Sequence, residues 1–278
     1  MDRFACVNGT DNLQIPEKLW KELDIETSQQ LHLSADLIGK TAVGLAQSGW
    51  LRLPFCNTLC SEALGSKPVL SQSGARVKEP PYQNVEQLPQ ELERSTPRLD
   101  TMLRALGALS KDGCHVAYNI EGPFTLLCSM LPMNRVFSAL RKPTGVQMLQ
   151  TAEDWVSQYT ALAVEQGAGM ISFADPVATI DILGERMFTA IYVPCLKRLL
   201  ARLHQEYPRV PIHLCGKLTQ CLLDIGACSV AKWTGETQCE TYGHVLEDYL
   251  QTESGGLIGH FCLNFLNAKR SYLELIEL

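Results

Sequence analysis

The sequence predicts an α/β fold in the form of a (β/α)8 TIM-type barrel, and three observations lead to this prediction. After Leu99, short apolar segments alternate with amphipathic helical segments, which is typical of a parallel sheet with helices packed outside it. Several apolar segments end at polar residues, as expected where the strand ends of a barrel form a site. No Gly-x-Gly-x-x-Gly or Walker-type loop follows a predicted strand, which disfavours dinucleotide-binding and P-loop folds.

The first hundred residues carry a weaker pattern. Short amphipathic helices are expected at 16–23 and 27–37, and they form a helical extension over residues 1–40. Residues 42–53 are rich in apolar side chains and end before a proline, which is typical of a buried strand. Residues 66–98 are polar and rich in proline. We expect a long loop or lid there, with an ordered surface connection as the alternative.

The regular part of the chain begins with the apolar run 114–120, which ends at the turn Glu121-Gly122-Pro123. Each later strand is short and apolar, and each helix has its apolar residues on one face. The other predicted strands are 169–173, 210–215, 228–233, 256–261 and, as a closing strand, 272–278. The predicted helices are 153–166, 188–205, 218–224 and 242–250. We expect one barrel domain spanning residues 1–278.

Composition excludes several classes of protein. The chain has 278 residues, with 24 Lys and Arg against 30 Asp and Glu, and a net charge of −6. This balance disfavours binding to nucleic acid or to an anionic membrane through a broad basic field. No apolar run approaches the ~18 residues of a membrane span, and no signal peptide is evident. The 11 cysteines have irregular spacings, which favours a reducing compartment. We therefore expect a cytoplasmic protein.

Three predicted strand ends carry chemically capable side chains, and the most informative is His213-Leu214-Cys215. Residues i and i+2 of a strand project to the same face, so this imidazole and thiol could bind one ion together. Zinc prefers such nitrogen and sulfur ligands and needs a third. Cys262, near the end of a later strand, is the best placed, and Cys239 and Glu236 are the other candidates.

Each of these residues also has a plain structural interpretation. A buried histidine beside a buried cysteine is common in protein cores, so the pair His213 and Cys215 alone leaves packing and metal binding open. Asp175, which follows the strand 169–173, could be a functional group or could simply accept hydrogen bonds from a turn.

Three segments together resemble the uroporphyrinogen decarboxylase superfamily. Residues 121–126, Glu-Gly-Pro-Phe-Thr-Leu, are similar to its Gly-Pro-Phe-Thr-Leu element. Residues 175–184, Asp-Pro-Val-Ala-Thr-Ile-Asp-Ile-Leu-Gly, are similar to its Asp-Pro-x-Ala…Leu-Gly segment. Residues 54–65 resemble the Pro-x-Cys-x-Thr…Glu-Ala-x-Gly segment of the cobamide-dependent methyltransferase branch, whose zinc signature His213-x-Cys215 matches. The elements span most of the chain.

The resemblance implies a uroporphyrinogen decarboxylase-like barrel with zinc-dependent methyltransferase activity. The methyl donor is expected to be methylcobalamin or another methylated corrinoid on a corrinoid protein, and the acceptor a thiol or a similar molecule such as coenzyme M or tetrahydrofolate. The expected ligands of Zn²⁺ are His213, Cys215 and Cys262. Asp175 is expected to orient the His213 ring or to contact substrate. The residues expected to line the cofactor pocket are Tyr118, Asn119 and Gly122.

Two alternatives follow from the same resemblance. One is a metal-free decarboxylase acting on a tetrapyrrole, but the Arg-Gln-Ala-Gly element of that branch is absent from this sequence. The other is a non-catalytic barrel that binds a corrinoid protein.

Overall fold

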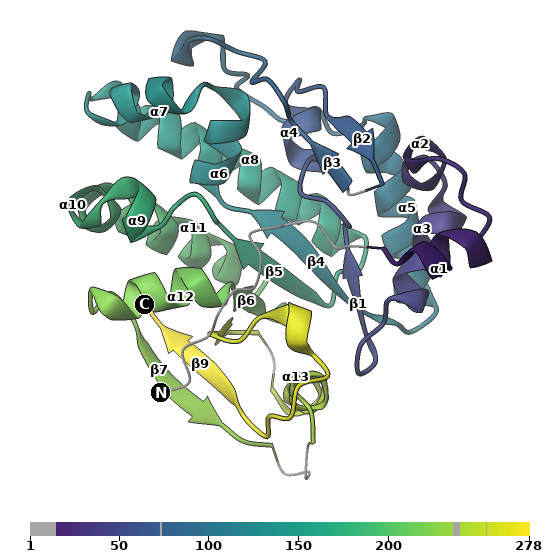
Figure 1. Cartoon of the computed structure of the whole chain (residues 1–278). Helices are drawn as coiled ribbons and strands as arrows, with labels where there is room; N and C mark the ends of the chain where they lie inside the picture. The colour runs from purple at the N-terminus through teal and green to yellow at the C-terminus, as the bar shows by residue number, and fades with distance from the viewer. Residues whose placement is uncertain (1–14, 73, 236–239, 254) are drawn as a thin grey trace.

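The computed structural model describes residues 15–72, 74–235, 240–253 and 255–278. Its centre is a seven-stranded sheet in the order β1-β4-β5-β6-β8-β9-β7 (Figure 1). The strands are β1 (Trp50–Leu53), β4 (His115–Glu121), β5 (Met170–Ala174), β6 (Ile212–Leu214), β8 (Leu257–Gly259), β9 (Leu273–Glu277) and β7 (Ser229–Trp233). A separate hairpin consists of β2 (Val69–Ser71) and β3 (Gly74–Arg76).

The strands from β1 to β8 pair in parallel, which confirms the predicted α/β fold with a parallel core. The last two strands in the sheet depart from a simple barrel, because β9 is antiparallel to both β8 and β7. Only the 3-10 turn η3 (Leu263–Phe265) lies between β8 and β9, and a parallel return would need a longer crossover. The expected closing strand therefore forms but returns antiparallel, and within the described residues β7 and β1 do not pair to close the sheet.

Helices cover one face of the sheet in Figure 1. The expected N-terminal helices are present as α1 (Glu17–Glu22), α2 (Ser28–His32) and α3 (Ala35–Gly44), so the predicted strand 42–53 is shortened to its last four residues. The outer helices are α4 (Leu59–Ala63), α5 (Pro97–Lys111), α6 (Pro123–Met130), α7 (Met133–Leu140), α8 (Thr144–Glu165), α9 (Ile180–Leu183), α10 (Glu185–Met187), α11 (Val193–Glu206) and α12 (Gly216–Asp224). The π-helical turn η2 (Phe188–Tyr192) precedes α11.

Residues 66–98 are more structured than a plain loop. They contain the β2–β3 hairpin and the 3-10 turn η1 (Val85–Gln87), and Leu88 and Leu92 are buried in the main core. The helix that follows begins as its sequence predicts. Thr96 caps α5 by accepting a hydrogen bond from the Leu99 backbone N–H at 3.4 Å, and Pro97 occupies the first helical position.

Successive side chains along each strand point to opposite faces of the sheet, so the buried residues form two separate cores. On the outer face, residues such as Val116, Tyr118 and Ile171 pack against the helices in the larger core. On the opposite face, here called the inner face, Ala117 and Met170 belong to a second cluster. This cluster includes Tyr242, Val245 and Leu246 of α13 (Tyr242–Thr252). Helix α13 therefore packs on the inner face rather than in the outer layer.

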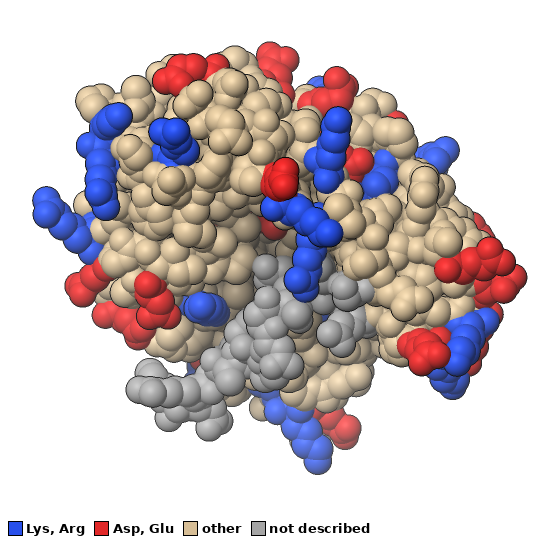
Figure 2. All heavy atoms as spheres, turned by 45° about the horizontal axis from the view of Figure 1, so that its top comes forward, with Lys and Arg blue, Asp and Glu red and all other residues tan. Residues whose placement is uncertain are grey.

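The surface carries both signs of charge. Figure 2 shows Lys and Arg side chains interspersed with Asp and Glu on the face that it presents, without a broad basic field there. Within the described ranges, no helix is both long enough and apolar enough to cross a bilayer.

Candidate functional site

The predicted site residues come to one end of the sheet. Because β1, β4, β5, β6 and β8 are parallel, the segments that follow them lie at the same edge. Asp175 follows β5, Cys215 follows β6, and Cys262 lies three residues beyond the end of β8. The sequence therefore brings these distant residues to one edge of the sheet, as predicted. Their individual contacts decide what they can do.

His213 lies on the inner face of β6 with only 2% of its surface exposed. Its Nε2 shares a hydrogen bond of 2.9 Å with the hydroxyl of Tyr242, the first residue of α13. Burial lowers the pKa of His213 to about 4, although hydrogen bonds to the backbone of His213 itself and of Phe261 oppose this effect. The imidazole is therefore neutral at pH 7 and is held by Tyr242 and the main chain.

Cys215 does not share the surroundings of His213. Strand β6 ends at Leu214, and Cys215 is the N-cap of α12, so strand alternation no longer governs where its side chain points. Its thiol packs against the larger outer core and acts electrostatically on Tyr192 of η2. That residues 213 and 215 project to one face therefore stays a prediction, which strand alternation alone no longer supports.

Cys262 lies on the inner side of the site. It caps η3, and its Sγ accepts a hydrogen bond from the Asn264 backbone N–H at 3.5 Å. It acts electrostatically on both Tyr242 and Arg52 of β1. Cys262 thus lies near Tyr242, the residue that holds His213, while Cys215 contacts a different core.

The described contacts of His213, Cys215 and Cys262 do not form a zinc site, so zinc binding by these residues stays a prediction. Across the described ranges, no group of three His, Cys, Asp or Glu side chains is placed to hold a metal. The Nε2 atom of His213 is already bonded to Tyr242. Cys239 and Glu236, the alternative third ligands, lie outside the described residues.

Asp175 is committed to the start of α6. It is 1% exposed, and its carboxylate accepts hydrogen bonds from the backbone N–H groups of Phe124 and Thr125 at 3.0 and 2.7 Å. The Thr125 hydroxyl donates a third bond at 2.6 Å. Burial raises the pKa of Asp175 to about 6 against the opposing effect of these bonds. Its bonded partners do not include His213, so the structural interpretation accounts for its contacts.

Gly122 is required by the same carboxyl group. A Cβ at this position would lie 2.5 Å from the Asp175 Cβ, closer than side-chain atoms can pack. Gly122 therefore lets the turn after β4 approach Asp175, which in turn satisfies the first N–H groups of α6. The Gly-Pro-Phe-Thr segment and the Asp-Pro segment form one interlocked unit.

Tyr118 and Asn119 were expected to line one pocket, but alternation along β4 places them on opposite faces. Tyr118 is fully buried in the outer core, where its hydroxyl lies 3.0 Å from that of Tyr159 on α8. It therefore does not reach the inner face, and this part of the expectation was wrong. Asn119 is partly buried, and its Nδ2 donates to the Pro54 carbonyl at 3.1 Å, which joins β4 to the segment after β1.

Comparison with known proteins agrees with this architecture. The family model for uroporphyrinogen decarboxylase (URO-D) matches residues 45–241, which include β1 to β7 and the interlocked Gly122–Asp175 unit. The chain belongs to the URO-D family. A methyltransferase from Methanosarcina mazei has the same fold, with a TM-score of 0.64 and 19% identity, over 76% of this chain and 66% of that one.

Two curated relatives of this chain are named methylcobamide:CoM methyltransferases. MtaA of Methanosarcina barkeri is 26% identical over 215 residues, which cover 72% of this chain and 61% of the relative. MtbA of Methanosarcina mazei is 23% identical over 229 residues, which cover 79% of this chain and 66% of the relative. This chain therefore spans a little under two thirds of the length of these relatives.

Sequence reasoning missed two residues that lie close to the candidate site. Tyr242 opens a predicted helix, and nothing local indicates that the helix packs on the inner face against His213. Arg52 is a charged residue within an otherwise apolar strand, next to Leu51 and Leu53 and 9% exposed. This arginine could have been singled out from the sequence, because a buried strand rarely contains an arginine without a role.

His260, at the end of β8, belongs to a neighbouring polar network. Its Nδ1 lies 2.7 Å from Glu274 Oε2, and its Nε2 lies 3.1 Å from Gln220 Oε1 on α12. Arg270 pairs with the same glutamate at 3.5 Å. The network joins β8, β9 and α12 beside the site.

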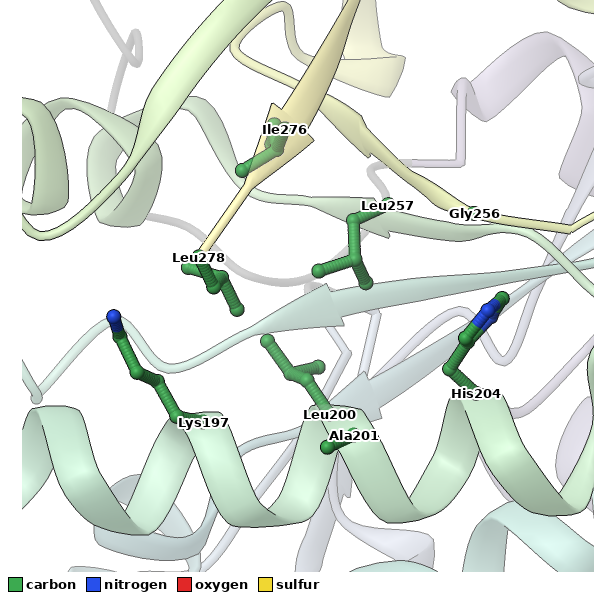
Figure 3. Close-up of a pocket in the computed structure, with 8 residues that line it drawn as sticks. All are labelled: Lys197, Leu200, Ala201, His204, Gly256, Leu257, Ile276 and Leu278. Atoms are coloured by element: carbon green, nitrogen blue, oxygen red, sulfur yellow. The ribbon is translucent and has the colours of Figure 1, made fainter.

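A separate cavity of about 440 Å³ lies between α11 and the last strands (Figure 3). Lys197, Leu200 and His204 of α11 form one wall, and Leu257 and Ile276 form part of the other. None of the predicted site residues lines this cavity.

Proposed function

We propose that this chain acts in the transfer of a methyl group from a methylated corrinoid, carried by a corrinoid protein, to a thiol or a similar acceptor. The observation that carries the proposal is the similarity to MtaA and MtbA, which covers 72% and 79% of this chain. The arrangement of the URO-D fold supports it, because polar side chains from several strand ends lie at one edge of the sheet.

The proposed reaction sets clear demands on the protein. The acceptor thiol must lose its proton, since the thiolate is the effective nucleophile. Its sulfur then forms a bond to the methyl carbon while the carbon–cobalt bond breaks, and that electron pair remains on the corrinoid. The protein must therefore hold the acceptor in line with the methyl group and keep water away.

The described residues meet part of these demands. His213 presents a neutral imidazole whose position is determined by Tyr242 and by the backbone of Phe261. Asp175 and Gly122 lock the turn between β4 and α6, which lies at the same edge of the sheet. We propose that these fixed residues form a rigid surface on which the acceptor is positioned. Correct positioning of the reactants contributes much of the rate in such transfers.

Zinc is a separate part of the proposal and rests on the resemblance alone. When bound, Zn²⁺ would favour the thiolate form of the acceptor. The candidate ligands are His213, Cys215 and Cys262, but their described contacts do not form a metal site, so we assign no step to the metal. If zinc binds, purified protein contains about one ion per chain, and His213→Ala and Cys215→Ala lose it. Comparing Cys262→Ser with Cys239→Ser identifies the third ligand, and metal content unchanged in all four variants would refute these ligands.

The central experiment is an anaerobic demethylation assay with free methylcobalamin, followed by the change in cobalt absorbance. The acceptors are neutral thiols, acidic thiols including coenzyme M, and tetrahydrofolate. Thiol-dependent demethylation above the protein-free rate supports the proposal, and turnover with tetrahydrofolate alone would assign the acceptor differently. Decarboxylation of a tetrapyrrole without demethylation would favour the lyase alternative. Binding of a corrinoid protein with no turnover on any acceptor would favour the non-catalytic alternative.

A further inference from the structure

The cavity of about 440 Å³ in Figure 3 lies on the outer face of the sheet. Helix α11 forms one wall, and the strands β8 and β9 with the residues beside them form the other. The lining residues Leu200 and Ile276 belong to the larger outer core, whereas His213 and Tyr242 meet on the inner face. The cavity has the size of a small-molecule site and is separate from the candidate site described above.

Small residues leave this space open. The α11 residues that line it lie on one face of the helix, at positions i, i+3, i+4 and i+7, and are Lys197, Leu200, Ala201 and His204. Ala201 carries only a methyl group. Across from α11, Gly256 precedes β8 with a backbone φ of +89°, a conformation that favours glycine. Neither Ala201 nor Gly256 fills the space between the helix and the sheet.

The interior of the cavity is apolar. In Figure 3 the side chains of Leu200 and Leu257 point toward each other across it, and Ile276 and Leu278 extend the wall opposite α11. Leu200 and Ile276 are buried, whereas Leu257 and Leu278 are half-buried. A hydrocarbon chain placed between these walls would leave water, and each methylene group that does so tightens binding about 3- to 4-fold.

Polar side chains lie at both ends of this apolar stretch of α11. Lys197 lies in the second turn and His204 in the last, about 10 Å apart along the helix axis. Burial raises the pKa of the Cys228 thiol, and the ammonium group of Lys197 opposes this effect. Cys228 is half-buried and precedes β7. The positive charge of Lys197 therefore lies near the sheet, at one end of the cavity.

These features fit one kind of ligand. A positive charge at one end favours an anionic head group, and the leucine and isoleucine walls favour a hydrocarbon tail. An extended chain of about eight carbon atoms matches the interval of about 10 Å between Lys197 and His204. A sugar or a nucleotide would place polar groups against Leu200 and Leu257, which is unfavourable without hydrogen-bond partners.

We propose that this cavity binds a medium-chain aliphatic carboxylate. Its carboxylate pairs with the ammonium group of Lys197, and its hydrocarbon chain lies between Leu200 and Leu257 and extends toward His204. The site goes beyond the proposed methyl transfer and does not depend on it, because it lies on the other face of the sheet from His213. Binding can therefore be measured on protein with or without methyltransferase activity.

The direct test is calorimetric titration of the wild-type chain at pH 7 with octanoate, 1-octanol, octylammonium and butyrate. Octanoate is expected to bind at one site per chain, about 3- to 10-fold more tightly than 1-octanol, as for a partly exposed ion pair. Octylammonium should bind more weakly than 1-octanol, because Lys197 repels it. Butyrate is four methylene groups shorter and should bind on the order of 100-fold more weakly than octanoate. Equal affinity for octanoate and octylammonium, or no saturable binding of octanoate, would overturn the proposal.

Variants assign the two ends of the ligand. Ala201→Trp fills the cavity from an exposed helical position, so the chain is expected to fold and to bind octanoate about 10-fold or more weakly. Lys197→Gln should weaken binding of octanoate about 3- to 10-fold and leave that of 1-octanol unchanged. Lys142→Gln, an exposed lysine outside the cavity, is the matched control and should bind as wild type. Octanoate affinity that is unchanged in both Ala201→Trp and Lys197→Gln would overturn this site.

Sedimentation velocity of wild type and Ala201→Trp tests whether a second copy of this chain covers the cavity instead. A monomer, or an oligomer that Ala201→Trp leaves intact, agrees with a cavity open to a small ligand. A dimer that Ala201→Trp dissociates, together with no saturable binding of octanoate, would overturn the proposal in favour of a contact between copies.

Discussion

The carboxyl group of Asp175 makes the pH dependence of folding a sensitive test of the site. Its ordinary pKa is 3.8, and burial raises it to about 6 in the folded protein. The folded state therefore binds this proton more tightly than the unfolded chain does. The stabilising effect of protonation is fully present below pH 3.8 and is lost as the pH rises through about 6.

The magnitude follows from the interval between the two pKa values. At ~1.4 kcal/mol for each pH unit, the interval corresponds to about 3 kcal/mol of unfolding free energy. About 2 kcal/mol of this falls between pH 4.5 and pH 7.5. His32 and His213, whose pKa values burial lowers to about 4, change stability in the opposite direction, because their contribution is lost as the pH falls.

The perturbation is Asp175→Asn, which removes the titration but keeps the size of the side chain. Unfolding free energies of wild type and variant are measured with urea at pH 4.5 and pH 7.5, and the two proteins are compared at each pH. The histidine contributions are shared and cancel in the comparison. We expect the stability of wild type relative to the variant to be about 2 kcal/mol greater at pH 4.5 than at pH 7.5.

The control is Asp181→Asn, which removes an exposed carboxylate. The difference in unfolding free energy between wild type and this variant should be the same at pH 4.5 and at pH 7.5. A constant difference between wild type and Asp175→Asn across this range would refute the reasoning, because it would mean that burial of the Asp175 charge has no cost. The offset between the two proteins at a single pH is uninformative, since asparagine also loses one acceptor for the α6 N–H groups.

Three further substitutions test the packing around the site by urea unfolding. Glu62→Ala leaves the buried Arg98 without its partner and should cost about 3–5 kcal/mol, and a loss below 1 kcal/mol would contradict that pairing. Gly122→Ala forces a Cβ against Asp175 and should cost ~1–3 kcal/mol or more, while wild-type stability would show that the turn can move away. Tyr242→Phe leaves the buried imidazole of β6 without its partner and should cost about 1–3 kcal/mol, whereas an unchanged value would place water in that position.

The sequence alone predicted the main strands of the sheet and the edge at which the candidate site lies, but not the helices α4, α6 and α7 or the β2–β3 hairpin. Strands such as 115–121 and 170–174 were predicted almost at their observed bounds, because alternation of apolar side chains and turn residues is a local property. The family resemblance of the Gly-Pro-Phe-Thr and Asp-Pro segments was confirmed. Their mutual contact through Asp175 follows from the parallel pairing of β4 and β5.

Only the tertiary structure decided which side chains meet within that edge. Strand β6 ends at Leu214, one residue before Cys215, so the two-residue spacing in the sequence does not determine where the thiol lies relative to the His213 imidazole. Strand β4, in contrast, continues through both Tyr118 and Asn119, so alternation along the strand places these two side chains on opposite faces. Helix α13 lies on the inner face and supplies Tyr242. These outcomes depend on contacts between elements far apart in the chain, and periodicity within one element carries no information about its partners.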